Sequence, residues 1–268
     1  METLLLTAIT AALEAGRDIL GIYNDPKQDF GIERRADNSP LTLADKAAHR
    51  RIMQHLDPTG IPVLSEEGAH QDYAKRCAWK TLWIVDPLDG TKEFIKKNGE
   101  FTVNIALVTE GTPVMGVIYV PVLGDLYFAS QGEAHKACVP CSADFPPADR
   151  IVREAQQLPL PREEKDEMVI VASRSHMNPE TEAYIEQRRQ EREVRLVSSG
   201  SSIKICLVAE GVADAYPRFA PTMEWDTAAG DAIARAAGCS VTDAESGLPL
   251  RYNKEDLHNP WFLVKADG

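Results

Sequence analysis

The chain has 268 residues, of which 44% are hydrophobic, enough to bury a core in one large domain or two modest ones. Its 41 acidic residues against 29 basic ones give a formal net charge of −12. This balance argues against a protein that wraps nucleic acid or adsorbs to anionic lipid. An anionic ligand would need local lysine or arginine side chains, or divalent cations held by an acidic site.

The N-terminal segment does not have the basic start of a secretory signal, and the charged residues Glu14 and Asp18 soon follow its first apolar residues. No apolar run reaches the roughly 18 residues that a membrane span requires. The five cysteines cannot all pair within one chain, so we expect a reduced, cytoplasmic protein. Cys138 and Cys141 form a C-x-x-C without a second pair, which favours free thiols over a zinc site.

Two helices are expected at the start of the chain. Apolar residues recur at helical spacing from Leu5 to Ile22, and a second helix is predicted from Ala44 to Leu56 after a turn at Pro40. Four short β-rich segments with glycine turns between them then predict an antiparallel meander. These segments are Leu82 to Val85, Thr102 to Val108, Val114 to Val120 and Leu126 to Ala129.

The stretch from Asp144 to Asp166 is rich in proline and charge, and we place a domain boundary there. Residues 1–165 would form an α+β domain with an antiparallel sheet, and residues 166–268 an α/β domain. The second half alternates between predicted strands and helices, as α/β units do. Its strands are Met168 to Ala172 and Val194 to Val197, and its helices are Glu180 to Gln190, Ser201 to Ala209 and Thr227 to Ala237.

Acidic residues gather where turns or strand ends are expected, at Asp45, Glu66, Asp86, Asp89 and Asp226. Magnesium prefers carboxylate and carbonyl oxygens at about 2.1 Å, so carboxylates that converge in one cleft could hold it. Pro87 predicts a tight turn that aims Asp86, Asp89 and the Leu88 carbonyl at one point. Ordinary turn and cap chemistry also explains each piece, and Asp226 would be a good N-cap for the helix after it.

The segment from Trp83 to Thr91 resembles the D-P-[IL]-D-G-T signature of the inositol monophosphatase superfamily. Glu66 matches the upstream glutamate of that family, and Trp225-Asp226 with Ala228 to Gly230 matches its W-D-x-A-[AG] signature. The resemblance covers nearly the whole chain. It implies an α+β and α/β fold in an αβαβα sandwich, of the inositol monophosphatase and fructose-1,6-bisphosphatase type, and inhibition by lithium. It also implies two or three Mg²⁺ ions at Glu66, Asp86, the Leu88 carbonyl, Asp89 and Asp226.

The resemblance further implies hydrolysis of a phosphate monoester, with catalytic roles for Asp45, Glu66 and Thr91. Thr91 paired with Asp45 would orient and deprotonate the attacking water, which Glu66 would also contact. Ions about 3.5–4 Å apart would lower the pKa of a water and stabilise the leaving oxygen. The implied contacts to the scissile phosphate and its metals are Glu66, Leu88, Asp89, Gly90, Thr91 and Asp226.

Substrate choice must depend on residues outside this shared metal site. A second phosphate needs fixed cations, and Arg174, His176, Lys204 and Arg218 lie near expected strand ends or helix starts of the second half, where ligand crevices form. The segments Lys92 to Lys96 and Asn98 to Ala106 resemble the bisphosphate nucleotidases of the superfamily. That resemblance implies hydrolysis of the 3′-phosphate of adenosine 3′,5′-bisphosphate, and also of its sulfated analogue. Ser201, Lys204 and Arg218 would bind the 5′-phosphate side and His176 the nucleotide, although a surface or core role explains each of them singly.

The alternative is an inositol-1-phosphate or broad sugar phosphatase, because the catalytic motifs are common to both. A non-catalytic sensor of the same fold is disfavoured, since every expected catalytic position is filled. The expected partner is a small-molecule nucleotide, with no nucleic acid and no membrane span; the oligomeric state is left open. Some enzymes of this type are assigned to the cytoplasmic face of the inner membrane. Only the apolar first helix could serve that location, and core packing explains this helix equally well.

Overall fold

The computed structural model describes residues 1–26, 30–34, 40–68, 71–161, 166–172 and 177–266. Its helices confirm the segments predicted as helical and add short ones. They are α1 (Glu2–Tyr23), α2 (Leu43–Leu56), η1 (Asp57–Thr59), α3 (Tyr73–Arg76), α4 (Thr91–Ile95), α5 (Ala148–Glu154), α6 (Pro179–Arg189), α7 (Ile203–Ala209) and α8 (Glu224–Ala236).

The strands form a seven-stranded sheet, a five-stranded sheet and a short ribbon. In spatial order the first sheet contains β3 (Val63–Ser65), β4 (Thr81–Asp89), β5 (Thr102–Thr109), β6 (Thr112–Val120), β7 (Asp125–Ser130), β8 (Glu133–Cys138) and β9 (Gln156–Gln157). The second contains β11 (Val194–Ser198), β10 (Met168–Ala172), β12 (Ala215–Arg218), β14 (Phe262–Ala266) and β13 (Cys239–Asp243). The ribbon pairs β1 (Glu33–Arg34) with β2 (Pro40–Leu41).

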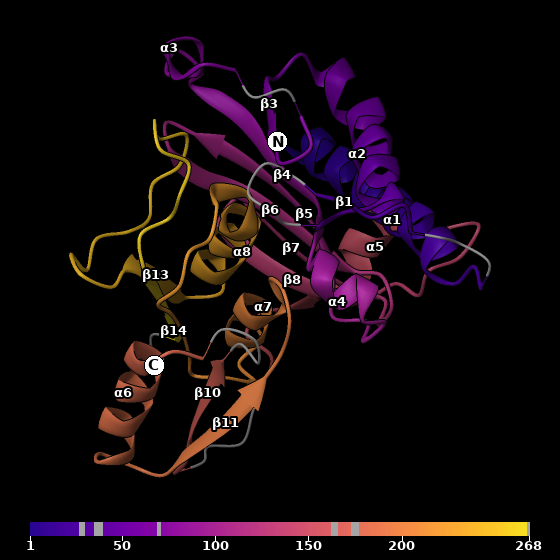
Figure 1. The fold of residues 1–268 in the computed structure, drawn as a ribbon. Helices are drawn as coiled ribbons and strands as arrows, with labels where there is room; N and C mark the ends of the chain where they lie inside the picture. Colours follow the sequence, from indigo (N-terminus) through magenta and orange to yellow (C-terminus); the bar gives the residue numbers. More distant parts are fainter. Residues whose placement is uncertain (27–29, 35–39, 69–70, 162–165, 173–176, 267–268) are drawn as a thin grey trace.

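These elements stack in five layers, which confirms the predicted αβαβα architecture (Figure 1). Helices α1 and α2 cover one face of the first sheet. Helices α7 and α8 lie between the two sheets, and α6 packs on the outer face of the second sheet. Because both faces of each sheet are covered, the central strands are almost continuously apolar.

The first sheet contains the predicted antiparallel meander from β4 to β7. The structure continues it with β8, which was not predicted, and adds β3 parallel to β4. Alternate residues of β4 serve different cores. Trp83 and Val85 pack toward α1 and α2, whereas Leu82 and Ile84 pack toward α7 and α8. Period-two alternation therefore builds two cores from one strand.

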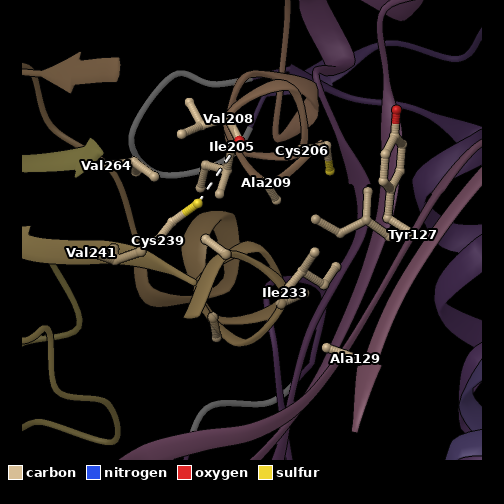
Figure 2. Packing of buried hydrophobic residues seen from close by; sticks show 14 of the residues in the cluster. Tyr127, Ala129, Ile205, Cys206, Val208, Ala209, Ile233, Cys239, Val241 and Val264 are labelled. Atoms are coloured by element: carbon tan, nitrogen blue, oxygen red, sulfur yellow. Dashed lines mark hydrogen bonds between the residues drawn. The ribbon is translucent and has the colours of Figure 1, made fainter. Parts of the chain in front are cut away.

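Helix α8 packs very closely on β6, which lies in the other half of the chain. A Cβ placed on Gly116 of β6 would lie 2.2 Å from the carbonyl oxygen of Ala229. Figure 2 shows the adjoining core, in which Ile205 and Ile233 of the middle helices lie between Tyr127 of the first sheet and Val241 of the second. The helices of the second half thus complete the core of the first sheet.

The proline-rich stretch differs from the expectation that it is an irregular crossing. It contains α5, and β9 pairs with the edge strand β8. The second sheet also continues beyond the predicted strands, since β14 runs antiparallel to both β12 and β13. The division into domains 1–165 and 166–268 stays a prediction, and residues 162–165 lie outside the described ranges.

The apolar face of α1 is buried. Leu5, Ile9, Leu13 and Ile19 belong to the same core cluster as the apolar residues of α2 and of the first sheet. Among the described residues, no helix combines the length and apolar character that crossing a bilayer would need.

Candidate functional site

Strand β4 ends in an irregularity that presents two carboxylates. Both Asp86 and Asp89 belong to the strand, and the register between β4 and β5 shifts between these two residues. The predicted tight turn is therefore wrong in form: Pro87 has no N–H for the ladder, and the strand bulges instead of reversing. Asp86 Oδ1 accepts the Leu88 N–H at 3.0 Å. Gly90, with φ of +93°, then turns the chain into α4.

The second half of the chain contributes a third carboxylate. Asp226 is the third residue of α8 rather than its N-cap, and its Oδ2 accepts the Met223 N–H at 2.8 Å. Asp86, Asp89 and Asp226 each offer a carboxylate oxygen, and these oxygens lie within 4.8 Å of one another. A set of carboxylates at this spacing suits a hard divalent cation.

The cluster concentrates negative charge, which Arg218 and Lys204 offset only in part at Asp226. Burial raises the pKa of Asp86 well above its usual value, and the charges of Glu66, Asp89 and Asp226 raise it further. Burial, followed by the charge of Asp89, raises the pKa of Asp226 to about 7. Glu66 belongs to the same electrostatic cluster, and its N–H donates to the Val85 carbonyl at 3.1 Å. A bound cation would favour the ionised form of all these groups.

The first turn of α2 brings a further carboxylate to the start of α4. Asp45 is fully buried, and its Oδ2 accepts the N–H of Thr42 at 2.7 Å and its hydroxyl at 2.5 Å. These bonds form a capping box that fixes the Asp45 side chain. Thr91 Oγ1 lies 3.2 Å from Asp45 Oδ1 and 3.4 Å from the Leu88 carbonyl oxygen.

A cationic recess adjoins the acidic cluster. It is a cavity of about 280 Å³ named here for the basic residues Lys96, Lys204 and Arg218 in its walls. Ser201 and the carboxylates of Asp89, Glu93, Glu100 and Asp226 also line it. Lys204 Nζ donates to the Ser201 carbonyl at 2.6 Å. Burial, helped by the charge of Arg218, lowers the pKa of Lys204 to about 8. The recess thus holds basic groups whose solvation is incomplete.

A second cavity, of about 330 Å³, contains the acidic site. Glu66, Asp86, Leu88 and Thr91 line it, and Asp89, Gly90 and Asp226 line both cavities. The two cavities therefore meet at the end of β4. His176 and its motif from residue 173 lie outside the described residues.

Sequence reasoning missed His258, which lines the acidic cavity. Its Nδ1 lies 2.7 Å from Asp256 Oδ1, and a backbone bridge pairs the residue with Met223 at the start of α8. The only available signal was the Asp-x-His spacing, which is common in loops.

The layered fold and its two adjoining cavities define a class of protein. A carboxylate cluster beside buried basic groups suits a site for cations and a small anionic molecule. Residues 1–265 match the model of the inositol monophosphatase family. The chain belongs to this family, which is metal-dependent, and the acidic cluster offers the ligands for a metal.

Relatives cover nearly the full chain. The 3′(2′),5′-bisphosphate nucleotidase CysQ of Shigella flexneri is 46% identical over 256 residues, which are 94% of this chain and 96% of the relative. The crystal structure of CysQ from Bacteroides thetaiotaomicron matches with a TM-score of 0.91 and 58% identity, covering 100% of this chain and 98% of that one. The suhB protein of Bartonella henselae matches with a TM-score of 0.71 and 25% identity, covering 97% and 92%.

Proposed function

We propose that this chain is a 3′(2′),5′-bisphosphate nucleotidase, which hydrolyses the 3′-phosphate of adenosine 3′,5′-bisphosphate to give AMP and phosphate. The observation that carries the proposal is the junction of the two cavities at Asp89, Gly90 and Asp226. One cavity offers carboxylates for metal ions, and the other offers Lys204 and Arg218 for a second phosphate. A substrate with two phosphates matches both, and the near-complete alignment with relatives named for this activity supports it.

In this proposal Glu66, Asp86, Asp89, Asp226 and the Leu88 carbonyl hold two or three Mg²⁺ ions at the scissile phosphate. Carboxylates and a carbonyl are the oxygen ligands that Mg²⁺ prefers. Bound Mg²⁺ would supply charge neutralisation of the phosphate and a lowered pKa for the attacking water. The raised pKa values of Asp86 and Asp226 support this role, since both carboxylates stand in an environment that favours an added cation.

Asp45 and Thr91 handle the proton of the attacking water. Thr91 Oγ1 donates to Asp45 Oδ1, so the threonine oxygen keeps lone pairs for the water's proton. Asp45 holds that hydroxyl in orientation and takes up the proton passed through it. The N–H groups of Gly90 and Thr91 bind phosphate oxygens, and Glu66 contacts the water.

Lys204 and Arg218 bind the 5′-phosphate, Ser201 lines the recess on the same side, and His176 lies at the nucleotide. Two cations beside one recess suit a dianionic group, and desolvation strengthens the attraction. The sulfated analogue has the same 3′-phosphate and is a second candidate substrate. Inositol 1-phosphate has no second anionic group for the recess.

The test compares phosphate release from adenosine 3′,5′-bisphosphate and inositol 1-phosphate, each with Mg²⁺, with a chelator, and with Li⁺ added to Mg²⁺. We expect preference for the nucleotide, loss of activity on chelation and inhibition by lithium. Preference for inositol 1-phosphate would leave the metal site in place but refute the role of the recess. Metal-independent release from both substrates would refute the proposed chemistry.

A further inference from the structure

A chain of buried hydrogen bonds joins β5 to the lining of the cavities, where Ser202 lines the cationic recess and Asp89 lines both cavities. It passes through Thr102 and Asn104 of β5 and Ser202 at the start of α7, which are 0%, 1% and 3% exposed. Thr102 Oγ1 donates to Asn104 Oδ1 at 2.9 Å, and Asn104 Nδ2 donates to Ser202 Oγ at 2.7 Å. Ser202 Oγ then donates to Asp89 Oδ2 at 2.6 Å. The chain therefore ends on a carboxylate of the acidic site.

Only one assignment of donors and acceptors is consistent along this series of hydrogen bonds. Asn104 presents its carbonyl oxygen to Thr102 and its NH₂ group to Ser202, so Ser202 accepts from Asn104. Ser202 has one proton left to give. Asp89 Oδ2 is nearer to it than the Asp226 carbonyl oxygen, at 2.6 Å against 3.0 Å, and a carboxylate is the stronger acceptor.

The other end of the chain reaches the cationic recess. Ser201 Oγ donates to Thr102 Oγ1 at 3.3 Å, and the Ser201 carbonyl accepts from Lys204. Ser201 has a φ of +42°, a backbone conformation that is uncommon for a residue with a side chain. The hydrogen bond to Thr102 helps to hold Ser201 in this conformation.

Two glycines, Gly200 and Gly90, allow the loop of residues 199–202 to pack closely on Glu100 and on the end of β4. A Cβ on Gly200 would lie 2.7 Å from the Glu100 carbonyl oxygen. A Cβ on Gly90 would lie 3.3 Å from Ser201 Cβ. Gly200 therefore packs against the Glu100 backbone, and Ser201 packs against Gly90, the residue after Asp89. The hydrogen bond from Ser202 to Asp89 joins the same two segments.

We propose that Thr102, Asn104 and Ser202 are positioning residues that fix the Asp89 carboxylate and, through Ser201, its separation from the cationic recess. The proposal rests on the proposed function, in which Asp89 serves the 3′-phosphate and the recess serves the 5′-phosphate. The three residues touch no reacting atom. They act as a spacer, which suits a substrate whose two phosphates have a fixed covalent separation.

Ser202→Ala tests the end of the chain at Asp89. It removes the donor to this carboxylate, and we expect Mg²⁺ binding, measured by isothermal titration calorimetry without substrate, to weaken about tenfold, the lower end for loss of a residue that orients a metal ligand. Unchanged Mg²⁺ affinity in a folded Ser202→Ala protein would overturn the positioning of Asp89.

Thr102→Val tests the end at the recess and keeps the shape of the side chain. We expect KM for adenosine 3′,5′-bisphosphate to rise about fivefold, as for the loss of one hydrogen bond. KM for adenosine 3′-monophosphate, which has no 5′-phosphate, should stay within about twofold. Thr102→Ser should restore the wild-type KM, because it restores the hydroxyl.

Thr109→Val is the matched control at the opposite end of β5, where Thr109 Oγ1 lies 3.2 Å from Thr81 Oγ1. It also removes a hydrogen bond between two hydroxyl groups. We expect wild-type KM values with both nucleotides. If Thr102→Val raised KM equally for both nucleotides and lowered the melting temperature, the hydrogen-bond chain would have only a structural role, and the proposal would be overturned. A wild-type protein inactive on the bisphosphate would refute the proposed function instead, while the Mg²⁺ titration would still test Asp89.

Discussion

Thr91 Oγ1 lies 3.2 Å from Asp45 Oδ1, although 46 residues separate them in the chain. The carboxylate that receives this hydroxyl also accepts two hydrogen bonds from Thr42 at the N-cap of α2. Asp45 Oδ2 thus caps the start of α2, and Asp45 Oδ1 accepts a hydrogen bond from Thr91, which lines the acidic cavity. This division satisfies both oxygens of a fully buried carboxylate beside the acidic cavity.

Thr91→Ala should lower kcat for the bisphosphate by about 10²- to 10⁴-fold, the range of general acid–base catalysis, and leave KM nearly unchanged. Thr91→Ser retains the hydroxyl and should keep most of the activity. Asp45→Asn should reproduce the loss in kcat, because an amide is a far weaker base. Steady-state kinetics of the three variants decide, and a Thr91→Ala enzyme with wild-type kcat would exclude the proposed proton path.

Lys204→Met should weaken binding of the bisphosphate without weakening the fold. Burial lowers the pKa of Lys204 from 10.5 to about 8, so holding the lysine charged disfavours folding by on the order of 3 kcal/mol. Methionine keeps most of the stem and removes the charge. We expect KM for the bisphosphate to rise at least about tenfold, as for a lost charged hydrogen bond, with a melting temperature equal to or above that of the wild type.

Lys136→Met is the matched control, since Lys136 is held by Glu210 at 2.9 Å and Asp125 at 3.4 Å. Burial acts to lower the pKa of Lys136, but the hydrogen bonds and charges of Glu210 and Asp125 together outweigh it, and the pKa is raised. This variant should lose stability and keep its KM. A Lys204→Met protein that loses stability and keeps its KM would assign Lys204 to the fold alone.

The lowered pKa of Lys204 also predicts a pH dependence. In the free enzyme, kcat/KM for the bisphosphate should fall as pH rises through about 8, because the neutral amine no longer attracts phosphate. Stability should change in the opposite sense. Between pH 8 and 10.5 the unfolded chain binds more protons at this lysine, so its contribution to the free energy of unfolding rises with pH.

Adenosine 3′-monophosphate is the control substrate for this profile, since it places no phosphate beside Lys204. Lys204→Arg provides a second control, because an arginine remains charged throughout the range. Identical falls in kcat/KM for both nucleotides above pH 8 would assign the titration to another group.

The sequence predicted most of the architecture because the two periodicities are strong. The meander from β4 to β7 and the helices α1, α2 and α8 appear where apolar spacing places them, whereas β8 was not predicted. The bulge between Asp86 and Asp89 could not be predicted, since Asp-Pro-Leu-Asp suits a turn equally well and only pairing with β5 selects the extended form. Strands β13 and β14 were missed because only their mutual pairing and the contact with β12 specify them.

Some residues of the site could likewise be predicted from the sequence, and others could not. Asp86, Asp89 and Asp226 were found from motifs, because a cation site needs particular side chains at particular positions. Thr102 and Ser202 are ordinary residues in an ordinary strand and loop. Their proposed role depends on hydrogen bonds between residues 98 to 113 positions apart, which no local pattern encodes.

The contact between β6 and α8 gives a final prediction about the fold that holds the two halves of the site together. A Cβ at Gly116 would lie 2.2 Å from the backbone oxygen of Ala229, which cannot rotate away. Gly116→Ala should therefore lower the free energy of unfolding by about 3 kcal/mol or more, the upper range of overpacking. Since α8 carries Asp226, the variant should also weaken Mg²⁺ binding.

Gly21→Ala is the opposite case, because a Cβ there meets nothing within 4 Å and the residue is exposed on α1. It should raise the free energy of unfolding by about 0.5–1 kcal/mol through helix propensity. Urea denaturation measures both variants, and an unchanged m-value would show that the compared states are the same. If Gly116→Ala were as stable as Gly21→Ala, β6 and α8 could not approach as closely as the structure has them, and the placement of Asp226 beside Asp86 would lose its support.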